Sequence, residues 1–146
     1  MSERHQNPPD AAQRRLLAEI GNIAVVGLSP KPGRASHFVA NDMQQAGYRI
    51  IPVRPGVQEV LGEPAYARLA DVPERIDLVN VFLNPSRLPE LVDQCIELAV
   101  PAIWMQIGVV DHEQARRAAE AGIFVVMDRC IAVDYNRLNV SELRDA

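Results

Sequence analysis

Residues 23–36, IAVVGLSPKPGRAS, are the stretch that best indicates the fold. The stretch opens with β-branched and small apolar residues, which predicts a buried strand over residues 23–28. The apolar run breaks at Gly27, and a loop rich in glycine, proline and cationic residues leads to a predicted helix that begins at Ala35. An open α/β sheet builds a phosphate site from such a strand, turn and helix start, because the first N–H groups of a helix have no partner within it.

The side chains of this loop point to the same chemistry. Lys31 and Arg34 would add full positive charges to the helix start, and Ser29 and Ser36 would add hydroxyl groups. The alternative is that the two cations are merely solvated loop residues. Their position at a strand-to-helix turn favours a phosphate-bearing ligand, since the helix dipole also attracts an anion there.

Predicted strands and helices alternate along the rest of the chain. Further strands are expected over residues 48–53, 76–83, 102–106 and 123–127, and helices over residues 10–20, 35–46, 85–99, 111–121 and 131–144. Residues 57–73 read as an irregular connection with a weak helical signal at 67–70. Alternation with short connections implies parallel strands joined by right-handed crossovers. The predicted fold is therefore α/β: a single Rossmann-like, doubly wound, mainly parallel sheet of about five strands, with helices on both faces.

Length and composition limit the other possibilities. The chain has 146 residues, which suits one domain, and we expect a mobile polar tail over residues 1–9 and a single domain over residues 10–146. A hydrophobic fraction of 48% and a charged fraction of 23% are ordinary for a globular protein. The net charge of −4 gives no reason to expect binding to nucleic acid or to a membrane surface.

Targeting and metal signals are missing from the sequence. No apolar run approaches the roughly 20 residues that span a bilayer, and the N-terminus lacks the apolar core of a signal peptide. Cys95 and Cys130 are the two cysteines, so a reducing cytoplasm is the expected location. Neither a Cys-x-x-Cys nor a His-x-x-x-His spacing occurs, so no metal site is expected.

The predicted topology gathers four segments around one crevice. In a doubly wound sheet the ligand lies beyond the carboxyl ends of the strands, beside the first strand. This rule brings together residues 27–34, 53–55, 82–84 and 106–109.

The residues alone leave two ligands open. Gly27, Leu28 and Ser29 stand where a dinucleotide fingerprint has G-x-G, so the match is weak. Arg54 follows the second predicted strand, where an NAD site has an acidic residue. An arginine suits a phosphate on the ribose. NADP carries such a group at the 2′ position and coenzyme A (CoA) at the 3′ position.

Five segments in order add a family resemblance. They are VVGLSPKPGRASH, GYRIIPVRPG, IDLVNVFLNP, IWMQIGVV and GIFVVMDRC. Over roughly residues 22–138 the chain resembles the small CoA-binding proteins that are similar to the N-terminal domain of the succinyl-CoA synthetase α-subunit. The resemblance implies a cofactor site for CoA or an acyl-CoA. Its expected residues are Gly27, Leu28, Ser29, Lys31, Arg34 and Ser36 around the phosphates, Val53 and Arg54 near the adenosine, Phe82, Leu83 and Asn84 beside the adenine or the pantetheine arm, and Gln106 and Gly108 on the far side.

Two positions depart from the family pattern. The family commonly has asparagine where this chain has Arg54, and arginine after the Val-Phe of the third predicted strand, where this chain has Leu83 and Asn84. The cation is thus expected to have moved across the crevice, from the third predicted strand to the second.

Catalytic residues are not evident. A succinyl-CoA synthetase works through a phosphohistidine, and none of His5, His37 and His112 follows a segment that resembles its loop. Tyr135 is followed four residues later by Asn139 and not by the lysine of a hydride-transfer pair. We therefore expect a non-catalytic carrier, sensor or regulator that binds CoA or an acyl-CoA. The alternatives are an NADP-binding oxidoreductase of minimal size, or the CoA-binding subunit of a split acyl-CoA synthetase whose partner supplies the catalytic residues.

Cys130 and the mode of association remain open. Cys130 follows the last predicted strand at a helix start, where a thiol can become reactive, and it could form a mixed disulfide with CoA. The alternative is a small cysteine packed in the core. A homodimer through a sheet edge or the last predicted helix, or a partner subunit, is compatible with the sequence.

Overall fold

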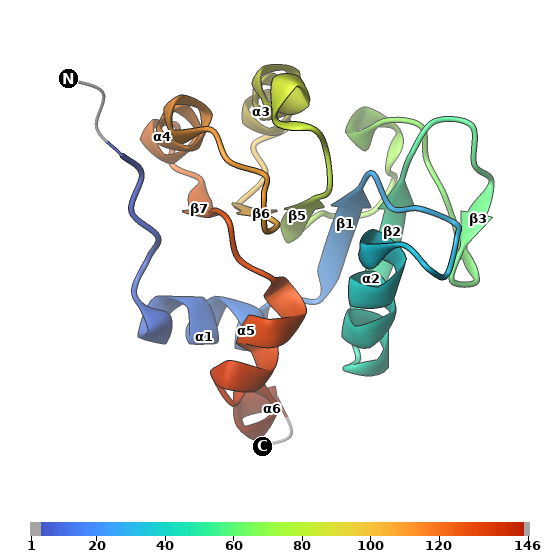
Figure 1. Ribbon diagram of the computed structural model, residues 1–146, viewed down its shortest axis with the longest axis horizontal. Helices are drawn as coiled ribbons and strands as arrows, with labels where there is room; N and C mark the ends of the chain where they lie inside the picture. Colours follow the sequence, from blue (N-terminus) through green and yellow to red (C-terminus); the bar gives the residue numbers. More distant parts are fainter. Residues whose placement is uncertain (1–3, 145–146) are drawn as a thin grey trace.

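The computed structural model describes residues 4–144 and contains one parallel sheet of five strands in the order β2-β1-β5-β6-β7 (Figure 1). These strands are β1 (Asn22–Val26), β2 (Arg49–Val53), β5 (Leu78–Val81), β6 (Ala102–Met105) and β7 (Phe124–Val126). Every neighbouring pair in this sheet is parallel. The predicted doubly wound α/β fold is confirmed.

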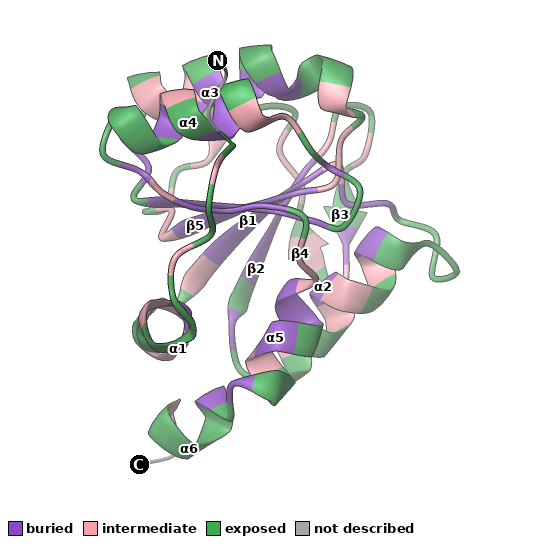
Figure 2. Ribbon diagram, turned by 60° about the vertical axis from the view of Figure 1, so that its left-hand side comes forward, coloured by how far each residue is buried: buried purple, intermediate pink, exposed green. Residues whose placement is uncertain are grey.

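Helices cover both faces of the sheet because the central strands are apolar on both sides. Figure 2 shows α3 (Leu88–Glu97) and α4 (His112–Glu120) on one face, and α1 (Asp10–Glu19), α2 (Ala35–Gln45) and α5 (Ile131–Arg137) on the other. Alternate side chains of β1 point to opposite faces of the sheet. Ala24 and Val26 pack on the α3 side, while Ile23 and Val25 pack on the α2 side.

Two segments differ from their predicted form. Residues 57–73 contain a short antiparallel hairpin, β3 (Glu59–Val60) and β4 (Glu63–Pro64), and a 3₁₀ turn η1 (Leu69–Asp71). The helix predicted from residue 85 begins as a 3₁₀ turn, η2 (Pro85–Arg87), before α3.

The last predicted helix is broken. It is divided into α5 and α6 (Val140–Arg144) at Asn139, whose φ is 52°. A residue in this left-handed region ends the helical hydrogen-bond ladder. Ile131 and Ala132 of α5 pack into the core, so α5 covers a face of the sheet.

The two outer strands each have a segment beside them. The Asn7 side chain donates to the Met127 carbonyl and accepts from the Met127 N–H, at 2.9 and 2.8 Å, just beyond β7. His5 donates from Nε2 to the Val125 carbonyl at 2.9 Å. Figure 1 shows this N-terminal segment running past β7 before α1. The sequence predicted a mobile tail here, but these bonds tie His5 and Asn7 to the sheet. On the opposite side, Tyr66 bonds through its backbone to Pro52 and Arg54 at the outer edge of β2.

Candidate functional site

The crevice opens where the loops after β1 and β5 meet. Gly27 ends β1 with a φ of +86°, and a Cβ placed on it would lie 2.2 Å from the carbonyl oxygen of Phe82. The Gly27 N–H donates to the Val53 carbonyl, and the Phe82 N–H donates to the Val26 carbonyl, both at 2.9 Å. Only glycine permits this approach and this φ together. Gly27 and Phe82 thus hold the loops after β1 and β5 together at the point where two cavities adjoin.

The first cavity, here called the phosphate-loop pocket, lies over the start of α2 and has a volume of about 630 Å³. Its lining residues are Gly27, Ser29, Pro30, Lys31, Arg34, Ala35, Ser36, Arg54, Pro55, Gly56, Val57 and Phe82. The Ser29 N–H donates to Ser36 Oγ at 2.9 Å, and the Lys31 N–H donates to Ser29 Oγ at 3.1 Å. These bonds hold the loop across the helix start. No side chain caps α2 at Arg34, so the N–H groups of its first turn remain for an anion.

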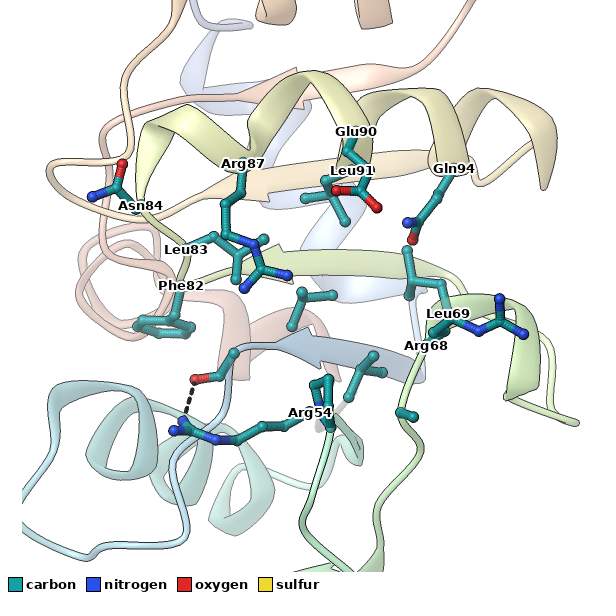
Figure 3. Close-up of a pocket in the computed structure, with 15 residues that line it drawn as sticks. Arg54, Arg68, Leu69, Phe82, Leu83, Asn84, Arg87, Glu90, Leu91 and Gln94 are labelled. Atoms are coloured by element: carbon teal, nitrogen blue, oxygen red, sulfur yellow. Dashed lines mark hydrogen bonds between the residues drawn. The ribbon is translucent and has the colours of Figure 1, made fainter.

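The second cavity, here called the α3 pocket, adjoins the first and also has a volume of about 630 Å³ (Figure 3). Apolar side chains line its base, namely Val26, Val53, Leu69, Leu83 and Leu91. Polar side chains stand around it, namely Arg54, Arg68, Asn84, Arg87, Glu90 and Gln94. Gly27, Pro55, Ala67 and Phe82 complete the lining. Because Gly27, Arg54, Pro55 and Phe82 line both cavities, the two form one continuous crevice.

Arg54 stands at the junction of the two pockets. It is half-buried, and its guanidinium donates to the Gly27 carbonyl at 3.4 Å, a long and weak hydrogen bond. Figure 3 shows the side chain extended beneath the loop that carries Phe82. The position after β2 thus carries a cation at the middle of the crevice, as the sequence predicted.

Charge in this region is unbalanced. Within residues 4–144, Lys31, Arg34, Arg54 and Arg87 form no salt bridge, whereas Arg49, Arg129 and Arg137 each bind carboxylates. The chain as a whole has a net charge of −4. Glu90 is the one carboxylate among the described residues that line either pocket. The crevice is therefore a local cationic site on an acidic protein, and it suits an anionic ligand.

Most of the predicted site residues lie together. Gly27, Ser29, Lys31, Arg34, Ser36, Val53, Arg54, Phe82, Leu83 and Asn84 all line one or both pockets. Leu28 does not, because its side chain is fully buried in the core on the α2 face. Their roles toward a ligand remain predictions.

Gln106 and Gly108 line neither pocket. Gln106 is buried, and its Oε1 accepts from Asn80 Nδ2 and from the Ile131 N–H, both at 3.3 Å. It therefore holds the start of α5 against the sheet. The Gly108 N–H donates to Asp128 Oδ1 at 2.8 Å, which ties together the loops after β6 and β7.

Cys130 also lies outside both pockets. It precedes α5, is half-buried, and packs against the core on the α2 face. Cys95 is fully buried on α3, and burial raises the pKa of its thiol to about 12, so it is a packing residue. Both cysteines are free.

Several lining residues were not identified from the sequence. Arg87, Glu90 and Gln94 come from η2 and from the exposed side of α3, and Arg68 comes from the segment before η1. In the sequence they read as an ordinary solvated helix face and a loop charge. The spacing of apolar residues in a helix shows which side faces the sheet. It does not show that the segment before η1 lines a cavity together with residues on another side of α3.

Three further features of the described residues concern metal binding, the histidine at the start of α4 and membrane-spanning helices. Within residues 4–144 no group of three or more His, Cys, Asp and Glu residues is arranged to hold a metal ion. The Nδ1 of His112 accepts from the His5 N–H at 3.0 Å, so it serves the N-terminal segment. None of the helices in the described range has the length and hydropathy needed to cross a bilayer.

Known proteins are similar to this chain in sequence and fold. YneT, an uncharacterized protein of Bacillus subtilis strain 168, is 43% identical over 128 residues, which cover 88% of this chain and 95% of YneT. A solved hypothetical protein from Pyrococcus horikoshii OT3 is 33% identical with a TM-score of 0.87, covering 94% of this chain and 99% of the other. A solved Thermus thermophilus protein is 37% identical with a TM-score of 0.86, covering 90% of this chain and 99% of the other.

Part of a larger enzyme is also similar. The ADP-forming acetate–CoA ligase I of Archaeoglobus fulgidus is 25% identical over 121 residues. The match covers 76% of this chain but only 18% of that ligase. A family model described as a CoA binding domain matches residues 21–136, which include the whole of the phosphate-loop pocket and the α3 pocket. The chain therefore belongs to the CoA-binding domain family, which is related to the CoA-binding part of the ADP-forming acetate–CoA ligases.

Proposed function

We propose that this protein binds CoA or an acyl-CoA in the crevice formed by the phosphate-loop pocket and the α3 pocket. The observation that carries the proposal is the concentration of cations that form no salt bridge within residues 4–144, Lys31, Arg34 and Arg54, around two joined cavities on an acidic chain. CoA bears several phosphate charges near one end and a long, largely uncharged arm at the other, so a local cationic site suits it.

The start of α2 is the proposed seat of the pyrophosphate. The loop held by Ser29 and Ser36 presents its backbone N–H groups and the helix dipole to an anion. Lys31 and Arg34 are exposed beside it and would complete the neutralisation. Arg54, at the junction with the α3 pocket, is proposed to lie near the ribose phosphate.

We propose a carrier, sensor or regulator in place of a catalyst. The two pockets are lined by one carboxylate, Glu90, and by no histidine or cysteine among the described residues. That lining offers binding groups for a phosphorylated ligand without a nucleophile and base in hydrogen-bond reach of each other. Free cysteines are typical of a reducing compartment, and we propose that the protein acts in the cytoplasm.

One observation favours a second candidate function. The α-subunit of the ADP-forming acetate–CoA ligase I of Pyrococcus furiosus is 24% identical over 88 residues, and the match spans 19% of that subunit. The chain could therefore supply CoA binding to an assembly whose other parts are separate polypeptides. Copurification of a second subunit from the native organism would favour this candidate, while purification alone with full CoA affinity would favour the first.

The test is calorimetric titration of the purified protein with CoA, with NADP as the control ligand. We expect CoA to bind and NADP to bind far more weakly. The double variant Lys31→Ala/Arg34→Ala should lose at least about 100-fold in CoA affinity, since each hydrogen bond to a charged group contributes about 1.5–3 kcal/mol and about 1.4 kcal/mol corresponds to tenfold.

The matched control is Arg15→Ala/Arg116→Ala, which removes two exposed cations that line neither pocket. It changes the net charge equally, so it should bind CoA nearly as the wild type does. Equal losses in the two double variants would show that the loop is not the phosphate site. NADP binding without CoA binding would overturn the proposal.

A further inference from the structure

Resting on the proposed function, we propose that Arg87 and Arg54 together bind the ribose 3′-phosphate of CoA in the α3 pocket. Arg87 would then be the residue that makes this protein prefer CoA to dephospho-CoA. Arg87 lies three residues beyond Asn84, outside the site residues that the sequence predicted.

The local fold directs Arg87 toward the cavity. Asn84 Oδ1 accepts from the Ser86 N–H at 2.9 Å, and the Arg87 N–H donates to the Asn84 carbonyl at 2.9 Å, which closes the turn η2. The next residue, Leu88, is fully buried and anchors the start of α3. Arg87 is thus held on a short rigid turn at the wall of the α3 pocket. Figure 3 shows its guanidinium directed into the cavity, on the wall opposite Arg54.

The charge on Arg87 is not used within the protein. Within residues 4–144 it forms no salt bridge, although Glu90 lies one helical turn further along the same wall. Arg68, at the rim of the same pocket, contrasts with it. Arg68 is 3.5 Å from Asp71, and Figure 3 shows its guanidinium directed away from Arg54 and Arg87. Two guanidinium groups on opposite walls, neither in a salt bridge within residues 4–144, suit a phosphate because each can donate a fork of hydrogen bonds to its oxygens.

The position of this pair separates it from the pyrophosphate site. Lys31 and Arg34 line the phosphate-loop pocket only, and Arg87 lines the α3 pocket only. Among the described cations, Arg54 alone lines both. An anion bound beside Arg87 is therefore a second anion, on the other side of Arg54 from the start of α2. CoA carries such a group, because its ribose separates the 3′-phosphate from the pyrophosphate.

The other end of the α3 pocket is less suited to a phosphate. Glu90 and Gln94 stand together above an apolar floor that includes Leu69 and Leu91, and Figure 3 shows both side chains beyond Arg87 from Phe82. A carboxylate repels a phosphate but accepts hydrogen bonds from amino groups. The phosphate is therefore expected at the Arg54–Arg87 end, and the Glu90–Gln94 end suits a flat, uncharged group that carries an amino donor.

The test compares CoA with dephospho-CoA, which lacks only the 3′-phosphate, by calorimetric titration of the full chain. The quantity of interest is the ratio of the two dissociation constants. We expect wild type to favour CoA by at least tenfold, and Arg87→Ala to reduce that preference by about tenfold while leaving the dephospho-CoA affinity nearly unchanged. Arg87→Lys should keep part of the preference, since it retains the charge without the fork of donors. The double variant Arg54→Ala/Arg87→Ala should bind both ligands equally.

Arg116→Ala is the matched control, because it removes the same side chain from an exposed position that lines neither pocket, and its preference for CoA should equal that of wild type. Arg87 is exposed, so its variants should unfold at the wild-type temperature. An unchanged preference in Arg87→Ala, or a wild type that binds both ligands equally, would refute this inference and leave the proposed function standing. A wild type that binds neither ligand would refute both.

Discussion

The contact between Gly27 and Phe82 predicts a large effect of a single methyl group. A Cβ at position 27 would lie 2.2 Å from the Phe82 carbonyl oxygen and 3.0 Å from its carbonyl carbon. The obstacle is backbone, and the Phe82 N–H is already bonded to the Val26 carbonyl. Relief therefore requires the ends of β1 and β5 to separate. Overpacking of this kind costs roughly 1–3 kcal/mol, and an L residue at a left-handed φ costs a further 1–2 kcal/mol or so.

Gly27→Ala should thus lower the free energy of unfolding by roughly 2–5 kcal/mol, a large part of the 5–15 kcal/mol typical of a folded domain. Two other glycines separate the two contributions. Gly122 has a φ of +89° but no atom within 4 Å of its would-be Cβ, so Gly122→Ala should cost only the backbone contribution of about 1–2 kcal/mol. Gly33 has neither constraint, so Gly33→Ala should be neutral or slightly stabilising, by up to about 1 kcal/mol.

The assay is urea unfolding followed by the fluorescence of Trp104, the single tryptophan, which is fully buried in the sheet. Gly27→Ala should also bind CoA more weakly, because Phe82 lines both pockets. A loss of stability in Gly27→Ala no larger than in Gly122→Ala would show that the two loops do not meet as described, and the reasoning would fail.

Two further predictions concern Tyr48 and Cys130. Tyr48 is buried, and its hydroxyl donates a hydrogen bond to the Leu17 carbonyl. Burial raises the pKa of this hydroxyl to about 12. The stability that the neutral hydroxyl contributes is therefore complete below about pH 10 and is lost as the pH rises through 12. Tyr48→Phe should cost about 1–2 kcal/mol near neutral pH and flatten the dependence of urea unfolding on pH above about 10, whereas an unchanged slope there would assign the alkaline loss to another group. Because Cys130 lies outside both pockets, we expect intact mass measured without reductant to show no CoA adduct; an adduct that disappears in Cys130→Ser would contradict this placement of the thiol.

The sequence predicted the sheet because its strands are long apolar runs separated by glycine and proline. It did not predict the β3–β4 hairpin, since each strand has two residues and the turn uses Leu61 at a φ of 56°, which no turn propensity would indicate. The break at Asn139 was missed for a similar reason: asparagine tolerates a left-handed φ, but nothing in the flanking pattern requires one.

The candidate site could be predicted where it depends on strand ends, and not where it depends on tertiary packing. The loop from Gly27 to Ser36 and the cation at Arg54 follow from local sequence and topology. Gln106 is polar and follows a strand end, as a ligand-binding residue would, but its amide oxygen accepts hydrogen bonds from Asn80 and Ile131. Arg87 could not be predicted, because it lines the crevice only as a result of the turn that places the start of α3 there.

The segments beside β2 and β7 have a consequence for assembly. An exposed edge strand presents a row of unpaired N–H and C=O groups, and this makes it a template for pairing with another chain. Here Asn7 satisfies both backbone groups of Met127, and Tyr66 takes the outer edge of β2. An added strand would have to displace these bonds at Met127, Pro52 and Arg54. Removal of residues 4–9 should therefore leave the backbone groups of Met127 open to pairing with another chain.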